Sequence, residues 1–422
     1  MADSLSLFEL REHTCRVQNF AKTFIDNLDM KILFVIPYFA PAWSFGGPVK
    51  VVYDLSKEFI RQGHEVTVAT TDVLTPKRRH DKKNDLLDGI NIVYFKNISN
   101  FLAYKANLYL PIGFRAWLKK NIRNFDVIHS HDLYSGLNVA VSKIAPKFYT
   151  PFIIQPHGAL NEIRMNARMK TPKALFLKIF ANILKLSSII IVSTDAEKNN
   201  EISRISEVLT RKTYVVPNGL NIGQLSLPKL NPKLRLRLGL KPEEKMIIYF
   251  GRIQFIKGLD ISLKALALIK NIPYKFIVIG RDEGTLSSLK ELAEEFQIKD
   301  RIIFLGPIFG KELSEHLGAA DLFLFNSRSE SLPMAVLDAC AASLPVVISA
   351  NCNLPEVEIF GAGIVLKENT PEETARAIIT YFSNPASSIV MRQECHKLIT
   401  DHFNLTTIAK QYLTLYKQVI TS

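Results

Sequence analysis

The sequence predicts an α/β protein made of two doubly wound domains, each built on a parallel sheet. From Lys31 onward, short apolar runs alternate with longer amphipathic stretches, which is the pattern of buried strands joined by helices. The alternation restarts near Met246, after a proline-rich stretch over residues 218–245. The length of 422 residues, with 47% hydrophobic and 22% charged residues, suits two or three globular domains.

The first set of elements opens with the apolar run Ile32–Ile36 and a helix over residues 49–61, which Gly63 is placed to cap. Further strands of this set are expected at 65–70, 90–95, 126–129, 152–154, 189–192 and 214–216. Strands of the second set are expected at 246–250, 276–279, 302–305, 322–325, 346–348 and 363–366. Helical stretches lie between these strands, and three more finish the chain.

These patterns divide the chain into five segments. They are an N-terminal extension of unassigned role (1–29), a first domain (30–217), a linker (218–244), a second domain (245–403) and a C-terminal helix (404–422) that is a candidate to pack back on the first domain. The extension is interpreted either as the result of an upstream translation start or as a short helix. Doubly wound sheets bind ligands beyond the carboxyl ends of their strands, so two such domains predict an interdomain cleft.

The net charge of +13 is concentrated in one part of the chain. Residues 101–185 hold 13 Lys/Arg and only 3 Asp/Glu. A solvated basic face is one interpretation, and an anionic membrane surface, a phosphorylated ligand or nucleic acid is the other. The chain has no uncharged apolar run of about 18 residues, which argues against a spanning helix. Its four cysteines form no CxxC pair, which argues against zinc or disulfides and for a reducing compartment.

The segment from Arg164 to Lys185 contains no acidic residue. It is interpreted either as a helix packed on the sheet, with the lysine stems along it, or as an interfacial helix at an anionic bilayer. In the second case Trp117, together with Lys119, Lys120 and Arg123, extends the surface.

Several polar or glycine residues follow predicted strands of the first domain. Gly46 and Gly47 open directly into a helix, where backbone N–H groups bind anions, although a tight turn explains them equally well. His157 stands beside a glycine at a strand end, and His129 and His131 share one side of another strand, one of them a candidate for a structural role. No GxGxxG fingerprint occurs, which counts against a dehydrogenase.

The second domain carries the more specific pattern. Arg252 follows its first strand and Lys257 precedes the next helix, so both cations suit a diphosphate, with a solvated pair as the alternative. Glu330 and Asp338 are eight residues apart, the first before a helix and the second about one turn inside it. Carboxylates accept hydrogen bonds only, so they suit sugar or ribose hydroxyls.

Here the chain resembles the retaining GT-B glycosyltransferases of the family-4 type, over roughly residues 30–420. The resemblance rests on the motif Glu330-x7-Asp338, which corresponds to the family's Glu-x7-Glu. The remaining matches occur in the family's order: Gly46-Gly47, His157, Pro217-Asn218-Gly219, Arg252, Lys257, Pro355-Glu356, Gly361 and Gly363. The family pattern has Glu where this chain has Asp338, and a Gly or similarly small residue where this chain has Ser331.

The resemblance implies a role for each matching position. Arg252 and Lys257 would bind the donor diphosphate as it leaves, and Glu330 would contact the donor sugar hydroxyls. His157 would lie near the reacting carbon. The remaining donor contacts would come from Asp338 at the ribose and from Gly46, Gly47 and the amides near Met334 and Ala335 at the phosphates.

The resemblance therefore implies a hexosyltransferase that uses a UDP- or GDP-linked sugar without a metal ion or other cofactor. The expected acceptor is a glycan or a lipid-linked molecule in envelope, capsule, lipopolysaccharide or exopolysaccharide synthesis. The expected location is cytoplasmic, with peripheral association at the inner face of the membrane as a hypothesis. The alternatives are another GT-B enzyme, such as a nucleotide-sugar epimerase or a phosphorylase, and a nucleic-acid-binding protein, which the poor interleaving of aromatic and basic residues disfavours.

Overall fold

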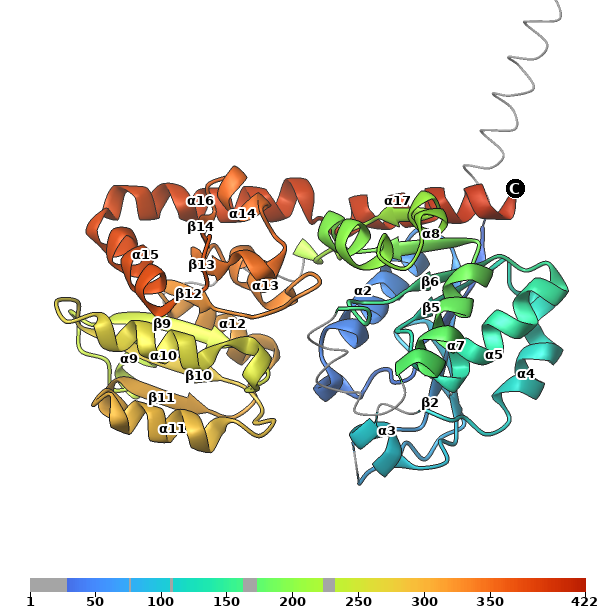
Figure 1. Ribbon diagram of the computed structural model, residues 1–422, viewed down its shortest axis with the longest axis horizontal. Helices are drawn as coiled ribbons and strands as arrows, with labels where there is room; N and C mark the ends of the chain where they lie inside the picture. Colours follow the sequence, from blue (N-terminus) through green and yellow to red (C-terminus); the bar gives the residue numbers. More distant parts are fainter. Residues whose placement is uncertain (1–28, 76, 107–108, 162–172, 223–231) are drawn as a thin grey trace, which may run out of the picture.

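The computed structural model describes residues 29–75, 77–106, 109–161, 173–222 and 232–422, which form two lobes side by side (Figure 1). Within these residues, the N-terminal lobe holds a sheet with the strand order β3-β4-β2-β1-β5-β6-β7-β8. The C-terminal lobe holds a sheet with the order β11-β10-β9-β12-β13-β14. Every neighbouring pair in these two sheets is parallel except β3 with β4. The predicted fold class of two doubly wound α/β domains is confirmed.

The strands of the N-terminal lobe are β1 (Lys31–Val35), β2 (Glu65–Thr71), β3 (Asn84–Leu87), β4 (Ile90–Phe95), β5 (Val127–His131), β6 (Phe152–Gln155), β7 (Ile189–Val192) and β8 (Thr213–Val215). Its helices are α2 (Gly47–Arg61), α3 (Asn100–Ala106), α4 (Phe114–Asn121), α5 (Gly136–Ile144), α7 (Lys173–Leu186) and α8 (Glu207–Arg211).

The strands of the C-terminal lobe are β9 (Lys245–Phe250), β10 (Tyr274–Ile279), β11 (Ile302–Leu305), β12 (Leu322–Phe325), β13 (Val346–Ser349) and β14 (Gly363–Leu366). The helices of the second half are α9 (Pro232–Arg237), α10 (Leu259–Leu268), α11 (Leu286–Glu295), α12 (Gly310–Ala319), α13 (Met334–Ala341), α14 (Glu356–Ile359), α15 (Pro371–Ser383), α16 (Pro385–His402) and α17 (Leu405–Ile420).

Strand β3 is the element that the apolar runs did not predict. It forms an antiparallel hairpin with β4 through Asp88 and Gly89, both with positive φ, as a tight two-residue turn requires. β3 lies at the edge of the sheet, none of its four residues is buried, and Leu86 is 68% exposed. A strand in this position needs no continuous apolar run, so its sequence resembles a loop.

Strand β1 divides the core of the N-terminal lobe into two layers. Ile32 and Phe34 belong to one apolar cluster, and Leu33 and Val35 belong to the cluster on the other face of the sheet. Successive side chains of a strand point to opposite faces, so a strand covered on both sides must be apolar throughout. The apolar run Ile32–Ile36, which predicted this strand, therefore reflects burial on both faces of the sheet.

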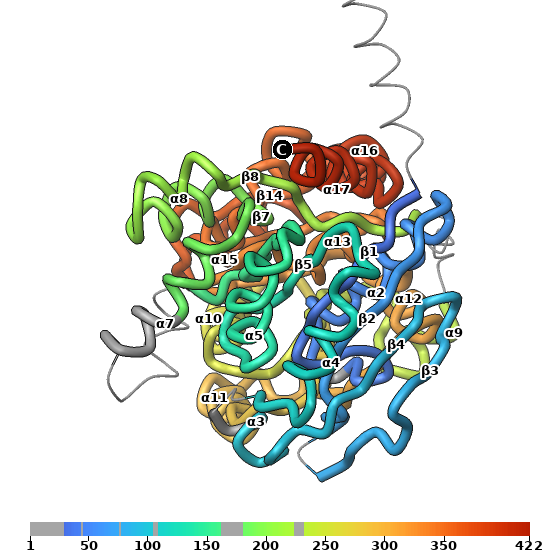
Figure 2. Tube along the Cα trace, turned by 90° about the vertical axis from the view of Figure 1, so that its right-hand side faces the viewer, coloured from blue at the N-terminus to red at the C-terminus, as the bar shows by residue number. Residues whose placement is uncertain are grey.

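Helix α17 lies in the core of the N-terminal lobe, although it follows the C-terminal lobe in sequence. Tyr412 and Tyr416 are buried there with Phe59 of α2, and α16 and α17 run along one edge of the molecule (Figures 1 and 2). The segment around Leu220, which leads out of the N-terminal lobe, lies beside the segment around Leu405, which leads back to it. The Leu220 carbonyl accepts a hydrogen bond from the Leu405 N–H at 3.0 Å. A Cβ on Gly219 would lie 2.7 Å from the Leu405 Cα, so only glycine permits this approach.

Each sheet has one point where the strand order changes direction. This point lies between β1 and β5 in the first sheet and between β9 and β12 in the second. Ligands of doubly wound sheets bind beyond the carboxyl ends of the strands at such points. The loops after these four strands are therefore where a site is expected.

Candidate active site

Gly258 brings the loop after β9 into contact with the loop after β12. It precedes α10 with a φ of 68°, and a Cβ at this position would lie 1.9 Å from the Asn326 carbonyl oxygen. No side chain fits in that space. The close approach sets Lys257, the preceding residue, directly against the segment that carries Glu330.

A buried ion pair between Lys257 and Glu330 forms the centre of the site. The Lys257 Nζ lies 2.5 Å from the Glu330 Oε1, and the two residues are 9% and 5% exposed. The Ser327 hydroxyl donates to the same oxygen at 2.6 Å, and the ammonium lies 5.5 Å from the centre of the Phe325 ring. Each ion of such a buried pair offsets the cost of removing the other from water, so losing either partner leaves an uncompensated charge.

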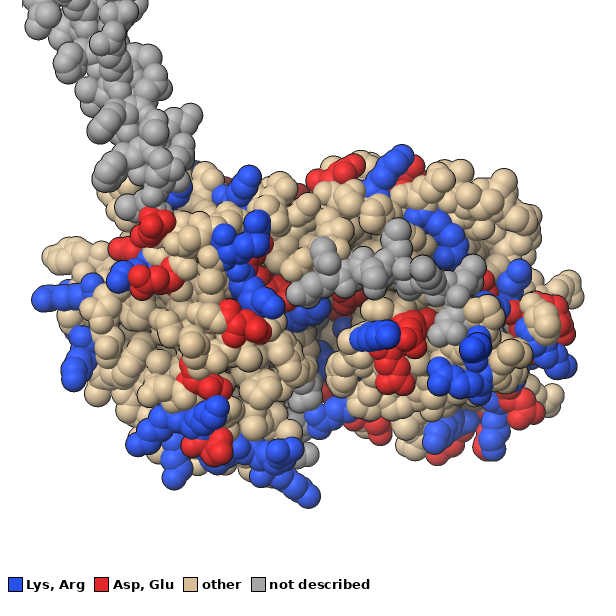
Figure 3. All heavy atoms as spheres, turned by 180° about the vertical axis from the view of Figure 1, so that it is seen from behind, with Lys and Arg blue, Asp and Glu red and all other residues tan. Residues whose placement is uncertain are grey.

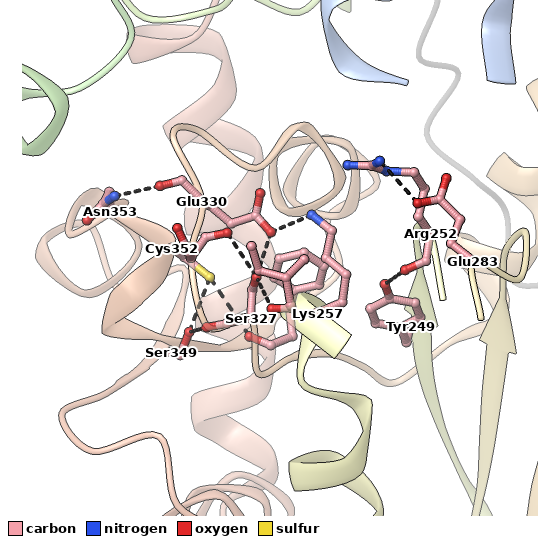
Figure 4. A network of polar contacts seen from close by, with 12 residues as sticks. Tyr249, Arg252, Lys257, Glu283, Ser327, Glu330, Ser349, Cys352 and Asn353 are labelled. Atoms are coloured by element: carbon pink, nitrogen blue, oxygen red, sulfur yellow. Dashed lines mark hydrogen bonds and ion pairs between the residues drawn. The ribbon is translucent and has the colours of Figure 1, made fainter. Parts of the chain in front are cut away.

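The backbone of Glu330 is also held on both sides. Its N–H donates to the Asn351 carbonyl at 3.0 Å, and its carbonyl accepts from the Asn353 side-chain amide at 2.7 Å. Figure 4 shows Asn353, from the loop after β13, bonded to Glu330 on the side of the residue away from Lys257. The carboxylate therefore has little freedom to move relative to the strand ends.

The nearby Cys352 is not suited to act as a nucleophile. Burial, followed by the charge of Glu330, raises the pKa of this thiol to about 12. The thiolate is the reactive form of cysteine, so Cys352 stays protonated and inert at neutral pH.

Arg252 lies at the end of β9, on the other side of Lys257 from Glu330 in Figure 4. Its Nη1 is 3.3 Å from the Glu283 Oε2, and its carbonyl accepts from the Tyr249 hydroxyl at 2.8 Å. The Arg252 side chain is 36% exposed, so its guanidinium remains accessible to an anionic ligand. The structure thus places both predicted cations at the same strand end.

Two helix N-termini face each other across the lobes. Gly46 precedes α2 with a φ of 93°, and a Cβ added to Gly47 would lie 3.6 Å from the Met334 Cγ in the first turn of α13. Ala335 is the next residue of that turn. The N-terminus of a helix carries unpaired N–H groups and a partial positive charge, so both ends favour an anion between them.

Asp338 contacts the opposite lobe through Lys50 of α2. The Lys50 Nζ is 3.9 Å from the Asp338 Oδ1 and 3.0 Å from the Asp54 Oδ2. Burial raises the pKa of Asp338, whereas the charge of Lys50 acts to lower it. The sequence had not singled out Lys50, because nothing local connects it to a residue of the other lobe.

His157 lies at the end of β6 with a φ of 53° and forms the outer end of a histidine row. Its Nε2 is 2.9 Å from the His131 Nδ1, and the His129 Nδ1 is 2.6 Å from the Tyr416 hydroxyl of α17. His129 and His131 are fully buried, and burial lowers the pKa of both well below the ordinary value. Both are thus neutral, and they share one side of β5, as alternation predicts.

No group of three or more His, Cys, Asp or Glu side chains suited to a metal ion occurs among the residues that the structure describes. Positive groups around the site include Lys50, Arg252, Lys257 and the two helix ends. They come from the carboxyl ends of β1, β9 and β12, so the site lies at both topological switch points.

Two family models match the chain, one in each half. Residues 45–224 match the model "Glycosyltransferase Family 4", and residues 231–399 match "Glycosyl transferases group 1". An uncharacterized glycosyltransferase of Methanocaldococcus jannaschii is 23% identical over 398 residues, 92% of this chain and 98% of that protein. The alpha-monoglucosyldiacylglycerol synthase of Streptococcus pneumoniae is 26% identical over 340 residues, 78% of this chain and 74% of that protein.

Among solved structures, Anabaena HepE in complex with UDP-glucose has a TM-score of 0.72 at 19% identity, covering 92% of this chain and 100% of that one. This likeness concerns the fold. Together with the two family models, it identifies the class of protein as a GT-B glycosyltransferase. The chain belongs to the retaining family-4 (group 1) glycosyltransferases, which use nucleotide sugars.

Proposed function

We propose that the enzyme transfers a hexose from a UDP- or GDP-linked sugar to a glycan or lipid-linked acceptor in envelope, capsule or exopolysaccharide synthesis. The observation that carries the proposal is the buried Lys257–Glu330 pair at the strand ends, next to Arg252 and two facing helix N-termini. A UDP-sugar is the first donor to test, since the Anabaena protein of the same fold is described with UDP-glucose. The pneumococcal relative is named as a synthase of a glucosylated diacylglycerol, and this supports a lipid-linked acceptor.

In the proposed reaction, the bond between the anomeric carbon and the diphosphate breaks while the acceptor oxygen bonds to the same face of that carbon. Arg252, Lys257 and the N-termini at Gly47 and Met334 stabilise the negative charge on the leaving diphosphate. The departing phosphate oxygen takes the proton from the acceptor hydroxyl, so no protein nucleophile is required. Charge complementarity at the leaving group is then the largest contribution of the protein.

The remaining residues orient the donor in this proposal. Glu330 accepts hydrogen bonds from donor sugar hydroxyls, and its rigid support by Lys257 and Ser327 fixes the direction of those bonds. Asp338 takes the ribose hydroxyls, and His157 lies against the sugar near the reacting carbon. Aligned reactants lower the entropic part of the barrier.

Lys257→Gln tests the assignment of the diphosphate site. Glutamine removes the charge but keeps a donor for Glu330, whereas alanine would leave a buried carboxylate unpaired at a cost of about 3–5 kcal/mol. We expect a loss of about 100-fold or more in kcat for sugar transfer, with unchanged circular dichroism. Lys299→Gln, at a lysine 69% exposed on the surface, is the control. Transfer by Lys257→Gln within tenfold of this control would remove the proposed role.

Peripheral membrane association is part of the same proposal, and one surface of the N-terminal lobe supports it. Ile98, Phe101, Leu102 and Ile112 are 60%, 65%, 40% and 56% exposed. Backbone hydrogen bonds from Ile98 to Leu110 and from Ile112 to Lys96 hold these segments together. Residues 96–125 hold six Lys/Arg and no acid. Exposed apolar side chains among bases are typical of surfaces that bind anionic bilayers.

The segment that the sequence suggested for this contact is only partly described. Residues 164–172 lie outside the described part of the chain, as do the side chains of 173–179. Phe180 and Ile183 of α7 are buried in the core, which agrees with the packed-helix interpretation for this end of α7. Trp117 is half-buried against the same core. Basic side chains gather along the lower edge of the N-terminal lobe in Figure 3 (left).

In the described part of the chain, no helix has both the length and the apolar character to cross a bilayer. A surface contact is therefore tested by sedimentation with phosphatidylglycerol vesicles at moderate salt. Phe101→Ser should reduce the bound fraction severalfold, whereas Ile389→Ser, at a residue 62% exposed on the C-terminal lobe, should not. Equal sedimentation of the two variants would remove this surface from the proposal.

A further inference from the structure

One buried carboxylate of the N-terminal lobe contacts both lobes next to the candidate site. Glu197 follows β7, is 1% exposed, and lies outside every role assigned so far. Its Oε1 accepts from the Gly158 N–H at 2.8 Å, and its Oε2 accepts from the Ser193 N–H at 3.1 Å. The same Oε2 accepts from the Ser331 hydroxyl of the C-terminal lobe at 2.8 Å.

The two outer partners of Glu197 are the neighbours of two proposed sugar contacts. Gly158 directly follows His157, so the hydrogen bond from the Gly158 N–H to Glu197 holds the backbone next to that histidine. Ser331 follows Glu330, whose backbone is itself held on both sides. A single carboxylate thus connects the segment of His157 to the segment of Glu330 through one hydrogen bond on each side.

Burial of Glu197 makes its hydrogen bonds to both segments strong and difficult to replace. A hydrogen bond to a charged group is about twice as strong as one between neutral groups, and a buried carboxylate that loses a donor is costly because water cannot replace it. Ser331 is 9% exposed, so its hydroxyl meets Glu197 only when the lobes are at their present separation.

We propose that Glu197 and Ser331 are an interdomain positioning pair, which sets the distance between His157 and Glu330 when the lobes meet around the donor. The inference rests on the proposed function, because it concerns the alignment of those two residues on one sugar. Neither member of the pair needs to touch the substrate. Reactant alignment is sensitive to displacements of about 1 Å, so loss of the pair should affect turnover more than donor affinity.

The test compares two serines of the same loop. Ser331→Ala removes the hydroxyl that bonds to Glu197, whereas Ser329→Ala removes a buried hydroxyl with no hydrogen-bond partner in the described part of the chain. We expect Ser331→Ala to lower kcat about tenfold, with the Kd for UDP by calorimetry within twofold of wild type. Ser331→Thr, which keeps the donor, should recover most of the loss, and Glu197→Gln should reduce kcat as Ser331→Ala does.

Small-angle scattering with UDP gives a readout that does not depend on activity. Ser331→Ala should have a larger radius of gyration than Ser329→Ala, because one contact between the lobes is lost. If the wild-type enzyme transferred sugar from none of the donors tested, the proposed function would be overturned. The radii of gyration of Ser331→Ala and Ser329→Ala would then still test whether the pair holds the lobes together. An active wild type, with Ser331→Ala equal to Ser329→Ala in both kcat and scattering, would overturn the inference alone.

Discussion

Gly258→Ala is the substitution whose effect on activity the structure specifies most closely. The φ of 68° costs alanine about 1–2 kcal/mol. In addition, the new Cβ would lie 1.9 Å from the Asn326 carbonyl oxygen, so the two loops must separate by about 1.5 Å to reach ordinary contact at 3.4 Å. That movement displaces Lys257 from Glu330. A misplacement of this size costs on the order of 100-fold in rate, so kcat for transfer from the donor should fall by about that factor.

Gly239→Ala separates backbone strain from steric displacement. Gly239 has a φ of 70°, almost the same as Gly258, but a Cβ there would meet nothing within 4 Å. Both variants should lose a similar amount of thermal stability from strain, with a further loss in Gly258→Ala from the displaced loop. Only Gly258→Ala should lose activity in a transfer assay with purified enzyme. If its kcat stays within twofold of Gly239→Ala, the close contact between the loops does not position the ion pair.

Three further predictions follow from the charges and burial. Burial raises the pKa of Asp338, and the positive charge of Lys50 partly offsets that rise. Lys50→Ala should therefore raise the pKa of Asp338 further. As the pH is lowered from 8, calorimetry should then show UDP binding weakening at a higher pH in Lys50→Ala than in wild type, an effect that Lys57→Ala on the same helix should lack. Burial lowers the pKa of His129 well below its ordinary value, so the unfolded chain binds more protons as the pH falls through about 6.5, and stability drops by up to about 1.4 kcal/mol per pH unit. His129→Gln should reduce that slope in denaturant titrations between pH 6.5 and 5, and an unchanged slope would contradict the argument. Because burial raises the pKa of Cys352 to about 12, iodoacetamide at pH 8 should modify it only after unfolding, as mass spectrometry would show.

The strands could be predicted because their signal is local. A strand covered on both faces must be apolar along its whole length, so runs such as Ile32–Ile36 and residues 322–325 were recognisable without any partner. Strand β3 lacks this signal because none of its four residues is buried. Glycine positions show the same division. The left-handed Gly89 serves a local turn, whereas Gly219 is required by a backbone that lies 186 residues away in sequence, at Leu405.

The histidine row shows what alternation along a strand could and could not predict. Alternation placed His129 and His131 on one side of β5, and the structure agrees. It did not distinguish a ligand from a core histidine, because the answer depends on α17, whose Tyr416 contacts His129 from 287 residues away. The burial that keeps both rings neutral comes from that helix and the neighbouring sheet.

By itself, the sequence determined the two α/β domains, the strand ends that carry Arg252 and Lys257, and the acidic pair Glu330 and Asp338. These follow from local periodicity and from the spacing of charges around single strands. The tertiary structure alone decided that Lys257 and Glu330 form one buried pair, and that Glu197 meets Ser331 across the lobes. Such contacts join residues that are 73 and 134 positions apart. The first contact depends on β9 and β12 being neighbours in one sheet, and the second depends on how the two lobes pack. No local pattern of residues encodes either arrangement.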